Sequence, residues 1–175
     1  MGGLSFGLSQ AGFDMQLGVE IDSTAAFNLK QNNKDMDVIV SDIRTIDPSQ
    51  IMESEGLKKG DIDIIAGGPP CQGFSRSNHR TRKTNNPEND LYKEYYRFIK
   101  LIEPEVFLFE NVDGLKTLNM GEKFQDILRI GSNLGYHIQW SIINSEKFGV
   151  PQKRNRLFIL GTKNKTDRSL FASDT

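Results

Sequence analysis

Apolar runs alternate with amphipathic stretches along this chain, which is typical of strands and helices that follow one another in turn. Short apolar runs predict strands over residues 16–20, 38–40, 62–66, 106–109, 137–143 and 157–160. Apolar positions at helical spacing predict helices over residues 4–11, 23–32, 89–102 and 124–134, with a long loop over residues 67–86. The order of these elements predicts an α/β fold, with a parallel sheet covered by helices on both faces.

Short signals at the element ends support these boundaries. Gly12 and Gly135 follow predicted helices, where glycine commonly ends the helix. Asp22 offers an N-terminal cap to the second helix, and Pro104 stops the third.

Polar or glycine-rich residues follow four consecutive predicted strands. They are Glu20 with Asp22, Asp42, residues 67–75, and Glu110 with Asn111. Ligands of α/β sheets bind at the carboxyl ends of the strands. The four segments are therefore predicted to form one site.

Composition narrows the class of protein. The 175 residues are enough for one domain, and 37% hydrophobic with 26% charged residues excludes a collagen, coiled-coil or disordered composition. A net charge of -1 argues against nucleic-acid binding by bulk charge alone, but it does not exclude binding through local basic patches. One cysteine excludes an intramolecular disulfide, and with only two histidines no metal site is predicted. No apolar run approaches the ~18 residues of a membrane helix and no signal peptide is recognisable, so we expect a cytoplasmic protein without a membrane partner.

The sequence GGPPCQGFS, residues 67–75, is the most informative segment. Two glycines free the backbone, two prolines restrict it, and Cys71 follows them. A thiol held beside backbone N–H groups and cations has a lowered pKa and acts as a nucleophile. A buried structural cysteine is the alternative, but the Gly-Pro surroundings favour the nucleophile.

Glu110 comes directly after an apolar predicted strand. Desolvation there would raise the pKa of its carboxyl and suit it to donate a proton near neutral pH. The alternative is a solvent-exposed acid at the start of a helix. Because a thiol is expected at a neighbouring strand end, Glu110 and Cys71 are predicted to act together as an acid and a nucleophile.

Basic residues gather in two places. Arg154 and Arg156 lie on the same side of an extended segment, so together they can address one anionic or carbonyl-rich target. The other group lies in the loop after the cysteine and comprises Arg76, Arg80, Arg82 and Lys83. Cations gathered around the thiol of a nearly neutral protein predict contact with a polyanion. An exposed strand edge and a solvated loop are the alternatives.

Glycines at the N-terminus indicate a bound nucleotide-like group. Gly2, Gly3 and Gly7 lie before and within the first predicted helix, and Glu20 ends the next strand, where an acid can bind ribose hydroxyls. The spacing is not GxGxxG and no phosphate-binding lysine motif occurs, which disfavours dinucleotide and nucleoside-triphosphate sites.

Together, these motifs resemble those of the cytosine-5 DNA methyltransferase family, in family order from Gly2 to about Gly161. GGPPCQGFS is similar to its catalytic-cysteine motif, ENV to its glutamate motif and QKRNR to its Gln-x-Arg-x-Arg motif. GLSQAGF, with Glu20 and Asp42, is similar to its cofactor-side motifs.

The resemblance implies a Rossmann-like S-adenosylmethionine-dependent methyltransferase fold, with a mostly parallel sheet and an antiparallel last strand. It also implies residue roles. Cys71 would add as a thiolate to C6 of a cytosine flipped out of DNA. Glu110 would bind the N3 and amino edge of that base and supply a proton. Arg156 would hold the base O2, and Arg154 would support the cysteine loop or a phosphate.

S-adenosylmethionine is the implied cofactor, S-adenosylhomocysteine its product, and double-stranded DNA the implied partner. The residues implied to bind the cofactor are Gly2, Gly3, Glu20, Ile21, Asp42, Ile43, Pro70 and Leu91. The residues expected to contact DNA are Gln72, Ser75, Arg76, Arg80, Arg82, Lys83 and Gln152.

The chain also departs from the family pattern. We expect residues 1–175 to form one catalytic domain without the family's first strand, its target-recognition region and its C-terminal closing motifs. We expect the catalytic part of a bacterial or phage DNA methyltransferase from a restriction-modification system. The alternatives are an inactive fragment, one subunit of a split enzyme whose second subunit carries target recognition, and a tRNA methyltransferase. The tripeptide Gly73-Phe74-Ser75 disfavours the last.

Overall fold

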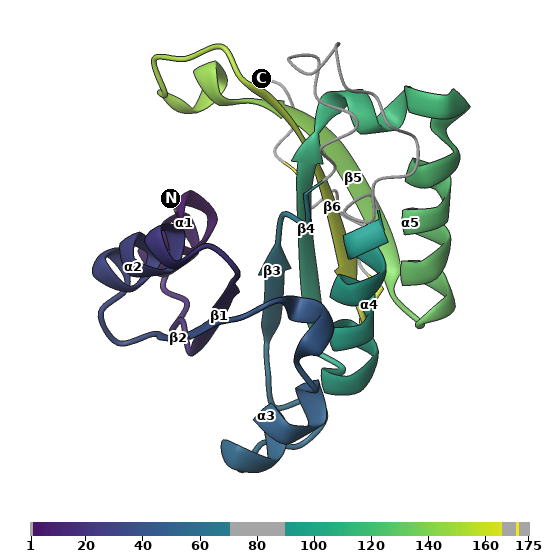
Figure 1. The fold of residues 1–175 in the computed structure, drawn as a ribbon. Helices are drawn as coiled ribbons and strands as arrows, with labels where there is room; N and C mark the ends of the chain where they lie inside the picture. The colour runs from purple at the N-terminus through teal and green to yellow at the C-terminus, as the bar shows by residue number, and fades with distance from the viewer. Residues whose placement is uncertain (1, 71–89, 166–170, 172–175) are drawn as a thin grey trace. The chain divides into compact units, whose positions relative to one another are not determined.

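The computed structural model describes residues 2–70, 90–165 and 171 of the chain. It divides into two compact units, Met1–Glu53 and Ser54–Thr175 (Figure 1). No helix within the described ranges is long and apolar enough to cross a membrane.

The first unit contains a pair of parallel strands with helices. Its elements are α1 (Gly3–Gln10), β1 (Leu17–Glu20), α2 (Ser23–Asn32), β2 (Asp37–Val40), the 3-10 helix η1 (Ile43–Thr45) and most of α3 (Pro48–Ser54). Strands β1 and β2 pair in register from Leu17 opposite Asp37 to Glu20 opposite Val40. Both strands therefore end at the same edge. The sequence analysis missed η1 and α3, because elements of three and seven residues carry little periodicity.

The predicted boundary signals act as expected. The Asp22 carboxylate accepts a hydrogen bond of 2.7 Å from the Ala25 N–H and caps α2. Gly12 and Gly135, with φ angles of 95° and 89°, follow α1 and α5. Pro104 comes just after the end of α4. These ends depend on neighbours in sequence, which is why the sequence alone could place them.

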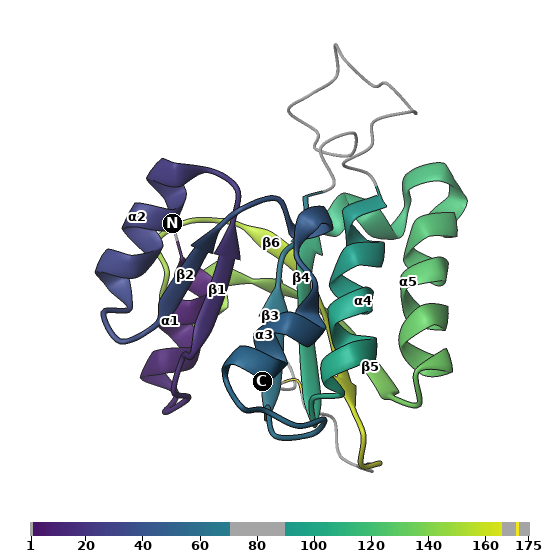
Figure 2. The ribbon, with the colours of Figure 1, turned by 60° about the horizontal axis from the view of Figure 1, so that its bottom comes forward.

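The second unit is a four-stranded sheet with two main helices. Its elements are β3 (Ile64–Gly67), α4 (Leu91–Ile102), β4 (Val106–Val112), the 3-10 helices η5 (Asp113–Lys116) and η6 (Leu118–Gly121), α5 (Glu122–Asn133), β5 (His137–Asn144), η7 (Ser145–Phe148) and β6 (Asn155–Thr162). The strand order is β3-β4-β6-β5 (Figure 1), and Figure 2 shows α4 and α5 side by side in the same unit. Strand β3 is parallel to β4, whereas β6 is antiparallel to both of its neighbours. The predicted α/β class and the antiparallel last strand are thus confirmed.

One expectation about β4 was wrong. The strand extends to Val112, so Glu110 and Asn111 lie inside it rather than after it. Strand β6 pairs with β4 in the opposite direction, and this pairing explains the longer strand. The ladder with β6 runs from Val106 opposite Thr162 to Val112 opposite Arg156, and this pairing keeps the polar residues extended.

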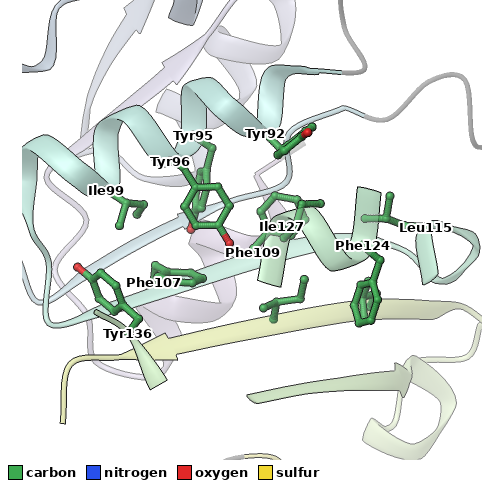
Figure 3. Close-up of a cluster of buried hydrophobic side chains, with 12 residues drawn as sticks. Tyr92, Tyr95, Tyr96, Ile99, Phe107, Phe109, Leu115, Phe124, Ile127 and Tyr136 are labelled. Carbon is green, nitrogen blue, oxygen red and sulfur yellow. The ribbon is translucent and has the colours of Figure 1, made fainter. Parts of the chain in front are cut away.

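Helices α4 and α5 pack on one face of this sheet around an aromatic core (Figure 3). Alternate residues of the two central strands, Phe107 and Phe109 of β4 and Leu157 and Ile159 of β6, are fully buried there. The rings meet edge to face, with centroids 5.1 Å apart for the Phe107–Tyr136 pair. This geometry is the favourable one for aromatic quadrupoles and adds to the gain from burial.

Gly161 of β6 leaves room for the Phe107 ring. A Cβ built on Gly161 would lie 2.1 Å from Phe107 Cε1, and Phe107 has no exposed surface through which to move away. We predict that Gly161→Ala lowers the free energy of unfolding by about 2 kcal/mol or more, as overpacking of a dense core does. Urea denaturation followed by circular dichroism would measure the change.

Gly7→Ala is a suitable control for that variant. Gly7 lies in α1, and a Cβ there would meet no atom within 4 Å. Alanine should leave stability unchanged or raise it by about 0.5–1 kcal/mol through helix propensity. Equal effects of the two substitutions would contradict the steric explanation.

Candidate functional site

The paired glycines of the GGPPC segment lie against side chains on opposite sides of the chain. A Cβ on Gly67 would lie 2.9 Å from Cε2 of the Tyr95 ring in α4. A Cβ on Gly68 would lie 2.8 Å from Oε2 of Glu110 in β4. Real Cβ atoms essentially never come this close to another atom. Position 67 therefore requires glycine, because the buried Tyr95 ring cannot move away, whereas a side chain at position 68 would displace the Glu110 carboxylate from this segment.

Asn111 holds the next residue of the segment. Its side chain is buried, and its Nδ2 donates a hydrogen bond of 2.9 Å to the Pro69 carbonyl oxygen. Its Oδ1 accepts from the Val112 N–H at 2.9 Å. Both ends of the buried amide are thus satisfied, which makes the contact stabilising rather than costly. This amide connects β4 to a carbonyl two residues before Cys71.

Glu110 and Arg156 form an ion pair across two strands. Arg156 Nε lies 2.9 Å from Glu110 Oε1, and the two side chains are 24% and 27% exposed. Glu110 is opposite Phe158 and Arg156 is opposite Val112, so the pair joins diagonal neighbours of an antiparallel ladder. Arg156 also donates from Nη1 to the Asn155 carbonyl oxygen at 2.7 Å. The arrangement presents a carboxylate and a guanidinium side by side, which suits a flat ligand with polar edges.

Two further predicted residues lie between η7 and β6. Gln152 and Arg154 are exposed, and their backbone is held by one serine. Ser145 Oγ donates to the Gln152 carbonyl oxygen at 2.6 Å, and the Ser145 N–H donates to the Arg154 carbonyl oxygen at 3.0 Å. Arg154 therefore precedes the strand, whereas Arg156 belongs to it.

Cys71, the predicted nucleophile, falls outside the described residues. So do most of the residues expected to contact DNA, namely Gln72, Ser75, Arg76, Arg80, Arg82 and Lys83. Of the two predicted cofactor residues in the second unit, Pro70 is exposed and Leu91, the first residue of α4, is half-buried.

The other cofactor residues lie in the first unit. Glu20 ends β1, and Asp42 follows β2, so the two carboxylates lie beyond the same edge of adjacent parallel strands. Glu20 Oε1 accepts from the Asp22 N–H at 3.1 Å. Ile21, the residue after Glu20, is 65% exposed. Two acceptors beside an exposed apolar side chain fit a nucleoside, whose hydroxyls and amino group are donors and whose base is flat.

Asp42 has an arginine partner within the same 3-10 turn. Its carboxylate accepts from the Arg44 backbone N–H at 2.9 Å and from Arg44 Nε at 2.9 and 3.0 Å. These hydrogen bonds lower the pKa of the Asp42 carboxyl below its ordinary value. Ile43, the first residue of η1, is half-buried.

The two N-terminal glycines differ in their surroundings. Gly2 precedes α1 in a left-handed conformation with φ of 86°, and a Cβ there would lie 2.8 Å from Leu29 Cδ1. Gly3 has no atom within 4 Å of such a Cβ. Glycine at position 2 therefore allows α1 to lie close to α2, whereas the backbone at Gly3 is accessible to a ligand.

A sequence profile of C-5 cytosine-specific DNA methylases matches residues 1–174. The chain belongs to this family. The resemblance seen in the order of its motifs is thereby confirmed.

Individual members of the methylase family are similar over most of this chain. It is 38% identical over 172 residues to the type II methyltransferase M.DdeI of Desulfomicrobium norvegicum, an alignment that covers 97% of this chain and 40% of that protein. It is 36% identical to M1.HphI of Haemophilus parahaemolyticus, with 93% and 43% covered. A crystal structure described as a DNA modification methyltransferase encoded within an E. coli prophage has a TM-score of 0.78 at 31% identity, with 92% and 43% covered. The chain thus spans about two-fifths of the length of these methylases.

Sequence reasoning identified Glu110 and Arg156 but missed their pairing with each other, and it assigned no role to Asn111. A signal for Asn111 was present, because an amide that alternates with buried phenylalanines along a strand is buried as well. No sequence signal pairs Glu110 with Arg156, since the two are brought together only by the ladder between β4 and β6.

The contact between Asp42 and Arg44 predicts a pH effect. We expect Arg44→Gln to raise the pKa of the Asp42 carboxyl toward its ordinary value of 3.8, because the charged hydrogen bonds are lost. Since the pKa is lowered in the folded chain, the stability that this contact contributes is present above about pH 4 and is lost as the pH falls through the folded-state pKa. Carboxyl ¹³C resonances followed against pH would measure the pKa directly. An unchanged Asp42 titration in the variant would contradict the assignment.

Proposed function

We propose that the chain is the catalytic part of a DNA cytosine-5 methyltransferase of a restriction-modification system, which transfers a methyl group from S-adenosylmethionine to C5 of a flipped cytosine. The observation that carries the proposal is the junction of β3 and β4. There, Gly68 and Pro69, which lead to Cys71, lie against Glu110 and Asn111. A nucleophile-bearing segment is thus attached to an acid that is itself paired with a guanidinium.

The proposed reaction begins with addition of the Cys71 thiolate to C6 of the cytosine. A proton held by Glu110 is delivered to N3 as the new S–C bond forms, and the displaced electron pair makes C5 nucleophilic. S-adenosylmethionine, when bound, supplies an electrophilic methyl group to that carbon. Loss of the C5 proton to solvent then restores the C5–C6 double bond and expels the Cys71 thiolate, while N3 returns its proton to Glu110.

The Glu110–Arg156 pair supports the recognition of such a base. A carboxyl group can address the ring nitrogen and the exocyclic amino group, whereas a guanidinium donates to a carbonyl oxygen. Cytosine carries these groups in sequence along one edge. A carboxyl and a guanidinium 2.9 Å apart therefore match the spacing of adjacent groups on one flat base.

The first unit supplies the proposed cofactor residues. Glu20 would accept hydrogen bonds from the ribose hydroxyls and Asp42 from the adenine amino group, with Ile21 against the base. The open backbone at Gly3 would admit the methionine end, and Pro70 and Leu91 are the cofactor residues proposed in the second unit. Hydrogen bonds from Arg44 lower the pKa of the Asp42 carboxyl and hold it in one orientation, and an ionised carboxylate is a strong acceptor.

Double-stranded DNA is the proposed partner, in the cytoplasm of a bacterium or of a phage-infected cell. Phosphate contacts of the basic loop would position the chain on DNA without reading sequence. The residues proposed for this role are Gln72, Ser75, Arg76, Arg80, Arg82, Lys83 and Gln152. Arg154 is proposed to support the cysteine segment or a phosphate.

Covalent trapping tests the nucleophile. The chain is incubated with S-adenosylmethionine and DNA containing 5-fluorocytosine, whose fluorine cannot leave as a proton does, so the Cys71 adduct accumulates and mass spectrometry detects it. We predict that Cys71→Ser abolishes the adduct, because an unactivated hydroxyl is a far poorer nucleophile than a thiolate. The chain has a single cysteine, so no other thiol can replace it. Adduct formation by the variant within tenfold of the parent would refute the mechanism.

A second substitution tests the acid. Glu110→Gln keeps the shape of the side chain but removes the transferable proton, and we predict a loss of about 10²-fold or more in the rate of adduct formation. Glu146→Gln, at an exposed position of η7, is the matched control and should leave the rate unchanged. DNA affinity, measured by fluorescence anisotropy, should be the same in both variants. A parallel loss of affinity and rate in Glu110→Gln would instead indicate a structural role.

A further inference from the structure

The Tyr95 hydroxyl contacts the two strands that form the junction. Tyr95 lies in α4, and its ring extends from the helix toward the sheet (Figure 3). Its Oη lies 3.0 Å from the Ile65 carbonyl oxygen of β3 and 3.0 Å from the Leu108 carbonyl oxygen of β4. A single hydroxyl hydrogen is thus shared between adjacent parallel strands.

The ring has little freedom to move. It is 5% exposed and meets the Phe109 ring edge to face, with centroids 5.5 Å apart. Its other side lies against Gly67, where a Cβ would come within 2.9 Å of the ring. Packing therefore fixes the position of the hydroxyl relative to both strands.

The two acceptors lie close in sequence to the residues that meet in the site. Ile65 is three residues before Gly68, and Leu108 is two residues before Glu110. We propose that Tyr95 is a positioning residue: its shared hydrogen bond fixes the spacing between β3 and β4 two to three residues before the point where Gly68 lies against Glu110. The catalytic consequence of this role rests on the proposed methyltransferase function, whereas the structural contact does not.

The hydroxyl acts as a donor and not as an acid. Burial raises the pKa of Tyr95 well above its ordinary value, with the Tyr96 side chain adding to the effect. The proton therefore stays on the oxygen throughout the neutral range, and the shared hydrogen bond does not change with pH there.

Tyr96 provides a matched control. It is the next residue of α4, lies in the same buried cluster and is 3% exposed. Its hydroxyl has no hydrogen-bond partner among the described residues. Tyr96→Phe and Tyr95→Phe thus remove the same atom from the same core, but only the second removes a hydrogen bond to the sheet.

The first measurement uses the 175-residue chain alone. Backbone amide resonances and hydrogen-exchange rates are compared for the parent, Tyr95→Phe and Tyr96→Phe, well below the unfolding temperature. We expect Tyr95→Phe to shift the amides of Gly67, Gly68 and Glu110 and to speed exchange in the β3–β4 ladder about fivefold, the factor that one hydrogen bond of ordinary net strength supports. Tyr96→Phe should leave these signals in place. Unchanged β3 and β4 signals in Tyr95→Phe, or equal changes in both variants, would overturn the inference.

The second measurement follows adduct formation with 5-fluorocytosine DNA and S-adenosylmethionine. We expect Tyr95→Phe to lower the rate at saturating DNA about tenfold or more, because small misplacements of reacting groups are costly, while the half-saturating DNA concentration stays the same. Tyr96→Phe should match the parent. A change in half-saturation without a change in rate would overturn the positioning role. A parent chain that forms no adduct would count against the proposed function, and the amide signals would still decide on Tyr95.

Discussion

The pairing of β3 with β4 is the constraint on which the candidate site depends. The two strands run parallel, from Ile64 opposite Val106 to Gly67 opposite Phe109, so the residues that continue from β3 lie beside the end of β4. One step further, the glycine at position 68 leaves a space that the Glu110 carboxylate occupies. Backbone pairing and a missing side chain therefore determine where the Glu110 carboxylate lies relative to the segment that leads to Cys71, the proposed nucleophile.

The order of elements and several of their ends could be predicted from the sequence, because they depend on residues close in the chain. Asp22 caps a helix that begins at the next residue, and Gly135 follows one that ends two residues earlier. The end of β4 could not be predicted in the same way. Glu110 and Asn111 are polar and would ordinarily indicate a loop, and only the ladder with β6, which begins more than forty residues later, keeps them extended. The sheet order has the same cause, since strand pairing is non-local.

Asp42 and Glu110, the two proposed acidic ligands, each contact an arginine, but the two arginines lie at very different distances along the chain. Asp42 and Arg44 are two residues apart, so their contact forms within a single turn. Glu110 and Arg156 are 46 residues apart and meet only when β6 has joined the sheet between β4 and β5. The local pair can form early and independently of the second unit's sheet. The Glu110–Arg156 pair, in contrast, forms only with the completed sheet, so the chemistry proposed for Glu110 depends on the folded second unit.

Strand β4 contributes to both the core and the candidate site, because its side chains alternate between the two faces of the sheet. Phe107, Phe109 and Asn111 are buried, whereas Leu108 and Glu110 are only partly buried and lie on the other face. A substitution that shifts the aromatic layer therefore moves the backbone that carries the acid. Asn111 shows the same coupling from the buried side, because its amide bonds a carbonyl of the nucleophile segment. Interiors of this density transmit a displacement instead of absorbing it. The aromatic core under α4 is thus part of what positions Glu110, which is why a hydroxyl as deep as that of Tyr95 can influence chemistry at the strand end.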